Sequence, residues 1–294
     1  MFIATLIAAD RLSEGEVRVA EDALAAANVQ PLARQWVEPG IACDIRFSGG
    51  AASARAALEG LLPGIDAVVQ PEAGRRKALL VADMDSTMIT IECIDELADY
   101  AGVKTQVADV TERAMRGELQ FEEALHARVA LLAGLDEAVI DRCHAERLAI
   151  MPGARALVRT MRAHGATCIL VSGGFTSFAD RVAEDIGFNR AIANRLNVAG
   201  GRLVGTVGHP IVGADAKLEA LTEAVSALSL DPTQVLAVGD GANDIKMLEA
   251  AGLGVAYRAK PRTRQAADAS VDACDLTALL YAQGYPRSAW AADQ

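Results

Sequence analysis

Two carboxylates follow a short apolar run that begins after Lys77. The run, Ala78 to Ala82, reads as a buried strand because it is aliphatic and too short for a helix. Asp83 and Asp85 come next, and an i, i+2 spacing in extended backbone points both side chains to the same side. A single Asp at a strand end is usually an ordinary turn residue. The sequence Asp-Met-Asp-Ser-Thr instead indicates a ligand site, because ligands bind at the carboxyl ends of strands in open α/β sheets.

A second set of polar residues follows the apolar run Thr167–Val171, which also reads as a buried strand. The run ends in Ser172, Gly173 and Gly174, where backbone N–H groups and a hydroxyl could hold phosphate oxygens. On its own, such a triplet is more often a plain turn. Lys217, expected in the first turn of a later helix, is equally ordinary on its own because surface lysines are common.

The most specific motif follows the apolar run Val235–Val238. Residues 239–244 read Gly-Asp-Gly-Ala-Asn-Asp, so carboxylate and amide side chains are separated by glycines. Asp240, Asn243 and Asp244 offer the oxygen ligands that Mg²⁺ prefers. A calcium-binding EF-hand loop is the rival interpretation, but the run is too short for one and lacks the distal Glu. The sequence therefore predicts a hard-cation site at this strand end.

The composition excludes several classes of function. The chain has 294 residues, of which 52% are hydrophobic, enough for two domains with sizeable cores. Its formal net charge of -11 argues against nucleic acid or an anionic membrane surface as a partner. No apolar run approaches a membrane span, and residues 1–9 lack the features of a signal peptide. The five cysteines include no Cys-x-x-Cys pair, and we expect reduced thiols in a cytoplasmic protein.

Residues 1–74 alternate between strand and helix patterns in the order β-α-β-β-α-β of a ferredoxin-like unit. The predicted strands are Phe2–Ala8, Leu32–Val37, Cys43–Phe47 and Ala67–Gln70, and the predicted helices are Ser13–Ala27 and Ala51–Leu62. The pattern resembles an ACT-type regulatory module, which would imply an amino-acid ligand or a homodimer formed through this module. A packing role without a ligand fits equally well. The polar segment Pro71–Lys77 contains both Pro and Gly, so we place a domain boundary after residue 74.

Residues 92 to about 150 show little strand signal. Apolar residues recur there at helical spacing, with charges on the opposite face. The predicted helices are Glu92–Ala101, Lys104–Arg116, Phe121–Ala133 and Asp136–Leu148, and the breaks between them are Gly102, Gly117 and Gly134. Roughly fifty helical residues inserted directly after the first strand end would form a small cap that excludes water from the site.

From Pro152 onward strands and helices alternate, which implies a parallel sheet covered by helices on both faces. Helices are predicted at Ala154–His164, Phe175–Ile186, Asp215–Leu228 and Ile245–Ala251, strands at Thr167–Val171, Val235–Val238 and Gly254–Tyr257, and a β-hairpin at Ala191–Val207. A further helix, a strand near Val271 and a last helix complete the chain. The predicted fold class is therefore α/β. Residues 75–294 form a doubly wound, Rossmann-like parallel sheet with a helical cap, after an N-terminal ferredoxin-like α+β domain.

The strand-end motifs resemble, in order and setting, those of the haloacid dehalogenase-like phosphatases. The resemblance covers residues 78 to about 285 and rests on Asp83-x-Asp85-Ser-Thr, Ser172-Gly-Gly, Lys217 and Gly239-Asp-Gly-x-Asn-Asp. It narrows to the phosphoserine phosphatase family through three positions in the predicted cap, which are Glu92, Phe121 and Arg128. Phe121 and Arg128 are seven residues apart, close to two helical turns, so their side chains face the same way.

The resemblance implies Mg²⁺-dependent hydrolysis through an aspartyl-phosphate intermediate, the last step of serine biosynthesis. Asp83 would attack phosphorus, and Asp85 would protonate the leaving oxygen and later deprotonate water. Mg²⁺ would be held by the side chains of Asp83 and Asp240 and by the backbone carbonyl of Asp85, with Asn243 and Asp244 in close support. The metal would offset the repulsion between an anionic nucleophile and an anionic phosphate.

The resemblance also implies how the substrate, O-phospho-L-serine, would be bound. The implied substrate-binding residues are Glu92, Phe121, Arg128, Ser172, Gly173, Lys217 and Asn243, of which Ser172 and Lys217 would also be catalytic. Glu92 would face the ammonium group, Arg128 the carboxylate through a bidentate fork, and Phe121 would cover the serine moiety. Ser172, the Gly173 N–H and Lys217 would hold the phosphoryl oxygens as charge shifts in the transition state. From spacing alone, Glu92 and Arg128 are also consistent with a solvated helix face.

Three functions fit the sequence. The first, which we favour, is phosphoserine hydrolysis. The second is a phosphotransferase or a broader phosphomonoesterase on the same scaffold, since an alcohol could trap the aspartyl-phosphate instead of water. The third is a regulatory or binding protein whose N-terminal module senses an amino acid while the rest is catalytically idle. The intact set of Asp83, Asp85, Lys217 and Asp240 argues against an idle site.

Overall fold

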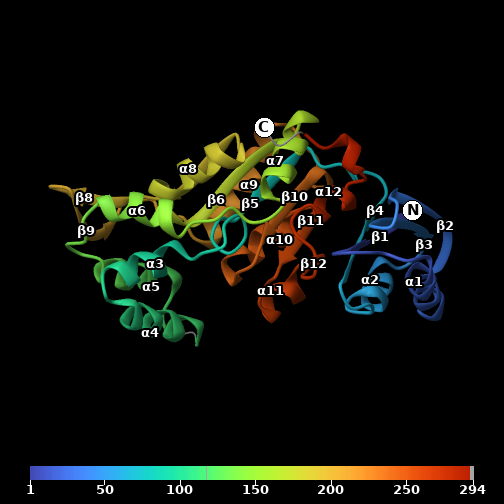
Figure 1. Ribbon diagram of the computed structural model, residues 1–294, viewed down its shortest axis with the longest axis horizontal. Coiled ribbons are helices and arrows are strands. Elements are labelled where there is room, and N and C mark those ends of the chain that lie inside the picture. The colour runs from blue at the N-terminus through green and yellow to red at the C-terminus, as the bar shows by residue number, and fades with distance from the viewer. Residues whose placement is uncertain (117, 292–294) are drawn as a thin grey trace.

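The computed structural model describes residues 1–116 and 118–291. Gly117, the predicted break between two cap helices, and the last three residues of the predicted second domain lie outside this part. The described chain has three regions along its long axis (Figure 1). A parallel sheet lies in the middle, the helices that follow its first strand lie at one end, and the N-terminal unit lies at the other.

The central sheet contains only parallel neighbours and runs in the order β12-β11-β10-β5-β6-β7. Its strands are β5 (Leu79–Ala82), β6 (Thr167–Phe175), β7 (Arg190–Asn194), β10 (Val235–Gly239), β11 (Leu253–Tyr257) and β12 (Ala269–Val271). The chain builds outward from β5 to β7 and then returns to the other side of β5 to add β10, β11 and β12. The predicted doubly wound fold is thus confirmed, and its switch point lies between β5 and β10, where ligands bind in such sheets.

Helices cover both faces of this sheet. The flanking helices are α7 (Ala154–Ala163), α8 (Thr176–Ile186), α9 (Ala214–Ala227), α10 (Ile245–Ala250), α11 (Pro261–Ala266) and α12 (Ala278–Ala282). Leu80 and Ala82 of β5 belong to the core beneath α7, α8 and α12, whereas Leu79 and Val81 belong to the core beneath α9 and α10. Because both faces are buried, β5 is apolar at every position, which explains its unbroken hydrophobic run.

The segment between β5 and α7 folds into four short helices, which are α3 (Cys93–Tyr100), α4 (Lys104–Met115), α5 (Phe121–Ala130) and α6 (Ala138–Glu146). Its two ends run side by side, since Ile89 and Ile150 form a β-bridge and the Thr90 N–H donates to the Ala149 carbonyl oxygen. A two-stranded hairpin, β8 (Leu196–Ala199) and β9 (Arg202–Val207), packs against α5. The predicted hairpin was too long, because residues 191–194 pair with β6 and extend the main sheet.

The N-terminal unit is an antiparallel sheet in the order β2-β3-β1-β4 with two helices on one face. Its elements are β1 (Phe2–Ala8), α1 (Glu14–Ala26), β2 (Gln30–Glu38), β3 (Ala42–Ser48), α2 (Ala51–Leu58) and β4 (Ile65–Pro71). The ferredoxin-like order predicted from the sequence is present. Ser13 and Glu16 form the reciprocal capping box that starts α1. Helix α2 ends earlier than predicted, before Gly60, which adopts a positive φ of 70°.

The opposite face of this antiparallel sheet packs on the region of the parallel sheet. Ile7, Ala42 and Val68 belong to the same continuous core as α7, α8 and α12, and β4 lies beside β12. Polar contacts cross the same boundary. Asp66 accepts hydrogen bonds from the backbone N–H groups of residues 272–274, and Gln70 donates to the Ala282 carbonyl oxygen over 2.7 Å. The N-terminal unit is therefore packed against the sheet region through shared core and buried hydrogen bonds.

Candidate active site

A buried lysine joins two strand ends at the switch point of the sheet. Lys217, in the first turn of α9 as expected, is 0% exposed, and its Nζ lies 2.5 Å from Asp83 Oδ1 and 2.6 Å from Asp244 Oδ1. Asp83 directly follows β5, and its backbone N–H donates to Val238 of β10. Burial alone would lower the pKa of Lys217, but Asp244 and Asp83 more than offset this and raise it. The ammonium group is therefore held charged between two carboxylates.

Three carboxylates surround this single cation. Oxygen atoms of Asp83, Asp240 and Asp244 all lie within 4.8 Å of one another. Burial and the neighbouring Asp244 raise the pKa of Asp83 well above its usual range, against the opposing effect of Lys217. Burial, Asp244 and Glu92 raise the pKa of Asp240 to about 6. Crowded carboxylate oxygens with one balancing ammonium group form a donor set that fits a hard divalent cation.

Glycines position the last two of these acids. A Cβ atom on Gly239 would lie 2.4 Å from Asp244 Cγ, and one on Gly241 would lie 2.4 Å from Asn243 Oδ1, so a larger residue at either position would displace the Asp244 or Asn243 side chain. The Gly241 N–H donates to Asp244 Oδ2 over 2.9 Å and fixes that carboxylate at the start of a short 3₁₀ turn, η2 (Ala242–Asp244). The tight glycine-rich turn is thus what brings Asp244 back to Lys217.

Asp85 lies on the same edge but in a different environment. Burial, followed by repulsion from Glu92, raises its pKa to about 7. A Cβ atom on Gly174 would lie 3.0 Å from both Asp85 Oδ2 and Ser172 Oγ, so Asp85 faces the loop at the end of β6. A carboxyl group with a pKa near neutrality can both donate and accept a proton, as a general acid–base requires.

The loop at the end of β6 interrupts the parallel ladder. Pairing between β6 and β7 stops after Val171 and resumes only at Phe175, which leaves Ser172 and the two glycines outside the ladder. Ser172 is 1% exposed, and its Oγ accepts a hydrogen bond from the Gly174 N–H over 2.9 Å. The loop therefore lies beside Asp85 with the Gly174 N–H already bonded to Ser172, which leaves the Gly173 N–H as its candidate donor to an anion.

Asn194 holds this loop in place from the end of β7. Its Nδ2 donates to the carbonyl oxygens of Gly173, over 2.9 Å, and Val212, over 3.2 Å. Its Oδ1 accepts from the Val212 N–H over 2.7 Å. Asn194 is completely buried, so its amide is committed to these three bonds. Sequence reasoning missed this residue because it lay inside the segment predicted as a hairpin, next to no recognisable motif.

Phe121, at the start of α5, closes over the glycines. A Cβ atom on Gly173 would lie 3.2 Å from Phe121 Cζ, and one on Gly213 would lie 3.0 Å from Phe121 Cδ1. The ring therefore rests on two backbone segments, and a side chain at either glycine would push it aside. This contact joins the helical segment 93–146 to the edge of the sheet.

Arg128 and Glu92 lie at the mouth of the same site. Burial lowers the pKa of Arg128, while Asp95, Glu92 and Asp85 oppose that effect, so its guanidinium faces these acids. Its Nε donates to the Ala124 carbonyl oxygen over 3.2 Å. Glu92 is exposed and accepts a hydrogen bond from Ser86 over 2.7 Å. Two opposite charges on the cap side could thus face a zwitterionic head group.

The structure places the predicted strand-end residues on one edge of the sheet, with the cap residues above them. Asn243 lies in the turn η2 beside Asp240 and Asp244. Two contacts in the site were not predicted from the sequence. Asp244 is the second partner of Lys217, and Thr87 donates to Asp240 over 3.3 Å. Both residues lay within recognised motifs, but their partners are far away in sequence.

A family model described as haloacid dehalogenase-like hydrolase matches residues 80–249. The chain belongs to this family. A phosphoserine phosphatase of Streptomyces coelicolor is 46% identical over 233 residues, which cover 79% of this chain and 57% of that protein. A phosphoserine phosphatase of Polaromonas sp. is 44% identical over 207 residues, which cover 69% of this chain and 88% of that protein.

One solved structure matches this chain over nearly its whole length, including the N-terminal unit. A probable phosphoserine phosphatase from Vibrio cholerae superposes with a TM-score of 0.76 at 32% identity, covering 98% of this chain and 87% of that one. The chain spans 57%, 63% and 52% of the relatives from Streptomyces coelicolor, Archaeoglobus fulgidus and Mycobacterium tuberculosis. Within residues 1–116 and 118–291, no helix is both long and apolar enough to cross a membrane.

Proposed function

We propose that this protein hydrolyses O-phospho-L-serine to serine and phosphate, the last step of serine biosynthesis, in a Mg²⁺-dependent reaction through an aspartyl-phosphate on Asp83. The observation that carries the proposal is Lys217, buried between Asp83 and Asp244 at the switch point of the sheet. The likeness to phosphoserine phosphatases, 44% and 46% identical to this chain, supports the choice of substrate.

Binding is assigned to groups on both sides of the site. The Ser172 hydroxyl, the Gly173 N–H and Lys217 would hold the phosphoryl oxygens, because they converge on the space beside Asp83 and Asp85. Arg128 would take the substrate carboxylate and Glu92 its ammonium group. Phe121, which already rests on Gly173, would exclude water from above.

In the first chemical step, an Asp83 oxygen forms a bond to phosphorus as the bond from phosphorus to the seryl oxygen breaks. Asp85, with a pKa of about 7, gives its proton to that seryl oxygen. Asp85 then takes a proton from the water that attacks the phosphorus of the aspartyl-phosphate. Phosphate leaves, and Asp83 returns as a free carboxylate beside Lys217.

The acidic cluster would hold the metal through Asp83 and Asp240, with the Asp85 carbonyl oxygen as a further ligand and Asp244 in support. When bound, Mg²⁺ would neutralise charge on the phosphoryl oxygens and on the crowded carboxylates. Lys217 adds a second positive charge, from the protein and not from the metal. It favours the ionised form of Asp83 because it lowers the pKa of that carboxyl group.

The test is phosphate release from a panel of phosphomonoesters, with Mg²⁺ or EDTA and with or without acceptor alcohols. We expect phosphoserine to have the highest kcat/KM, with activity lost in EDTA. Asp83→Asn should lose turnover by at least about 10³-fold, since it removes the nucleophile at nearly constant volume. Substantial turnover by Asp83→Asn would exclude the covalent route. Transfer of the phosphoryl group to alcohols in preference to water would indicate a phosphotransferase, and equal rates on all esters a broad phosphomonoesterase.

A further inference from the structure

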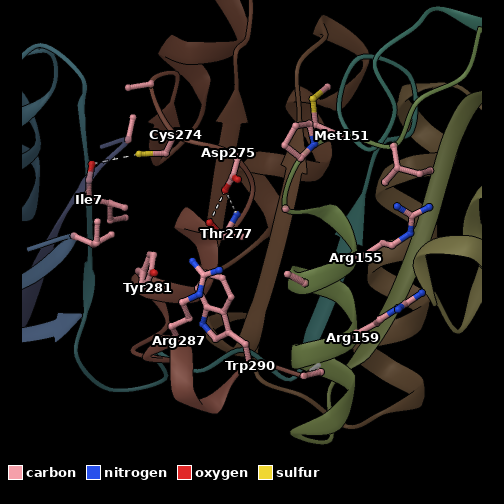
Figure 2. A pocket seen from close by; sticks show the side chains of 18 of the residues that line it. Ile7, Met151, Arg155, Arg159, Cys274, Asp275, Thr277, Tyr281, Arg287 and Trp290 are labelled. Atoms are coloured by element: carbon pink, nitrogen blue, oxygen red, sulfur yellow. Dashed lines mark hydrogen bonds between the residues drawn. The ribbon is translucent and has the colours of Figure 1, made fainter. Parts of the chain in front are cut away.

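A large cleft lies away from the active site, between the N-terminal unit and the sheet region (Figure 2). Its volume is about 1160 Å³, which exceeds the space that a small metabolite needs. Its walls come from the end of β1, the start of α7, the segment around α12 and the chain that follows α12. None of the proposed catalytic or metal-binding residues lines it.

The lining of this cleft is cationic although the chain as a whole carries a net charge of -11. Its charged residues are Arg155, Arg159, Arg258, Arg287, Asp185 and Asp275. Arg155 is neutralised by a bidentate ion pair with Asp185, at 2.7 and 2.8 Å. Four arginines against two aspartates leave a local charge of +2. An anion would therefore be attracted here despite the overall charge.

Two of these arginines have unused binding capacity. Within the described residues, neither the Arg258 nor the Arg287 guanidinium has a carboxylate within 4 Å, although the Arg287 backbone N–H donates to Glu38 Oε2 over 2.8 Å. The guanidinium of Arg287 lies over the Trp290 ring, 5.5 Å from its centroid, and the side chain extends toward Thr277 (Figure 2). Asp275 is already engaged, because it accepts two hydrogen bonds from Thr277. The available charge in the cleft is thus positive.

The remaining walls are apolar and aromatic. Ile7 and Met151 line the cleft together with Tyr281 and Trp290, whose ring centroids are 5.1 Å apart. A planar guanidinium pairs well with a carboxylate or phosphate group, while aromatic walls favour a compact apolar body. The chemistry of the cleft therefore suits a small organic oxyanion, which has both parts.

The cleft is connected to the active site through the backbone. Met151, which lines it, donates its N–H to the Met88 carbonyl oxygen over 2.9 Å, and the Met88 N–H donates to Met84 over 2.8 Å. Met84 lies between the two catalytic aspartates in the chain. Ile150, also in the lining, pairs with Ile89 where the helical segment returns to the sheet. A ligand that shifts residues 150–151 would act on both the cap attachment and the catalytic loop.

We propose that this cleft is a regulatory site for a small organic oxyanion, a carboxylate or a phosphate ester with a compact apolar body, held by Arg287. Its occupancy changes catalysis through the segment 150–151. Only the catalytic effect rests on the function proposed above, since binding to the cleft requires no turnover.

Binding is tested by calorimetry on the full chain, with benzoate and phenylphosphonate as probes and benzamide as the uncharged control. Arg287→Gln should weaken binding of the preferred anion roughly 10–150-fold, as expected for loss of a charge-assisted hydrogen bond. The matched control is Arg18→Gln on the exposed face of α1, which should bind as wild type. Preference for benzoate or phenylphosphonate tells carboxylate from phosphate ligands. Equal affinity in wild type and Arg287→Gln, or no heat with either anion up to its solubility limit, would overturn the site.

The regulatory part is tested by kinetics at a saturating concentration of the bound probe. In wild type, kcat/KM for phosphoserine should change, whereas in Arg287→Gln the same probe concentration should leave it unchanged. A probe that binds without altering kcat/KM would overturn the coupling. If phosphoserine is not hydrolysed at all, the proposed function fails, while the calorimetric result for the cleft still stands.

Discussion

Two buried charged clusters in this molecule are built in opposite ways. At the boundary of the N-terminal unit, Arg75 forms a bidentate ion pair with Asp44, at 2.6 and 2.7 Å, and also donates to Thr5 and to the carbonyl oxygens of Tyr281 and Ala282. The charge of Arg75 is balanced by the charge of Asp44, and the Arg75 guanidinium has further hydrogen-bond acceptors around it. At the sheet edge, one ammonium group faces three carboxylates.

The difference separates a structural cluster from a catalytic one. A satisfied pair such as Arg75 and Asp44 fixes the relative placement of two units and leaves nothing to bind a ligand. The carboxylates around Lys217 carry excess negative charge, and the pKa values of Asp83 and Asp240 are raised, so a bound cation or proton would balance that charge. Removing a charge should therefore stabilise the second cluster and destabilise the first.

The largest effect on activity in this comparison is expected for Asp85→Asn. Removal of the general acid–base should lower kcat by about 10²–10⁴-fold. The stability of the folded protein should instead rise. The pKa of Asp85 is raised from 3.8 to about 7 in the folded protein, so between these values the folded state binds more protons and its stability falls as pH rises.

Thermal unfolding in EDTA at pH 5 and pH 8 checks this prediction. The Tm of Asp85→Asn should lie above that of wild type at pH 8, with a smaller difference at pH 5. The matched control is Asp10→Asn, because Asp10 is exposed and far from the site. A Tm for Asp85→Asn below wild type at pH 8 would contradict the view that this carboxylate is destabilising in the folded protein.

Arg75→Ala should give the largest loss of stability. It leaves the Asp44 carboxylate buried without its partner, and removal of one member of a buried pair costs about 3–5 kcal/mol. Urea unfolding measures the change, with Arg18→Ala as the exposed control. The kcat/KM of the folded enzyme should stay near wild type, because Arg75 contacts none of the proposed catalytic residues. A fall in kcat/KM as large as the fall in stability would show that this cluster serves the active site.

Arg75 also shows where the sequence failed to predict the structure. The segment Pro71–Lys77 was interpreted as a polar linker, and we still propose the domain boundary there. In the structure, however, Arg75 and Lys77 are largely buried, and Lys77 donates to the Thr233 carbonyl oxygen over 2.8 Å. Their partners lie 31 to 207 residues away in sequence, so no local pattern could reveal them.

The central sheet and the strand-end motifs were easier to predict because their signals are local. β5 is buried on both faces, so its apolar run identifies it without knowledge of any partner. The glycines beside Asp240 leave room for the Asp244 and Asn243 side chains, which lie only a few residues further along the chain. In contrast, the role of Asn194 depends on two backbone segments, at residues 173 and 212, that only the folded chain brings together. Local chemistry was predictable, and long-range polar pairing was not.

An intermediate effect is expected for Arg128→Ala, which removes a partly buried charge that we assign to the substrate carboxylate and not to the phosphoryl group. Loss of a charge-assisted hydrogen bond costs about 1.5–3 kcal/mol, so kcat/KM for phosphoserine should fall roughly 10–150-fold. Hydrolysis of p-nitrophenyl phosphate, which has no amino-acid head, should change much less. The measurement is the ratio of the two kcat/KM values in wild type and variant. An unchanged ratio would mean that Arg128 does not bind the amino-acid part of phosphoserine.

The smallest effect is expected for Asn194→Ala. This residue combines features of both clusters. Asn194 is fully satisfied like the Arg75 cluster, yet its hydrogen bonds end on the phosphate-side loop of the active site. We therefore expect a positioning residue, whose loss displaces the Gly173 N–H from the phosphoryl group. Net values of about 0.5–1.5 kcal/mol per hydrogen bond predict roughly a tenfold fall in kcat/KM.

Two substrates distinguish this positioning role from a purely structural one. Because the proposed mechanism places the phosphoryl group of every ester at the loop of Gly173, Asn194→Ala should lower kcat/KM for phosphoserine and p-nitrophenyl phosphate equally, unlike Arg128→Ala. The matched control is Asn197→Ala, three residues further along, whose amide donates to Thr206 in the exposed hairpin. A lower Tm with unchanged kcat/KM for both esters would make Asn194 a purely structural residue. A loss confined to phosphoserine would instead place its effect on the cap side, since the phosphoryl group is common to both substrates.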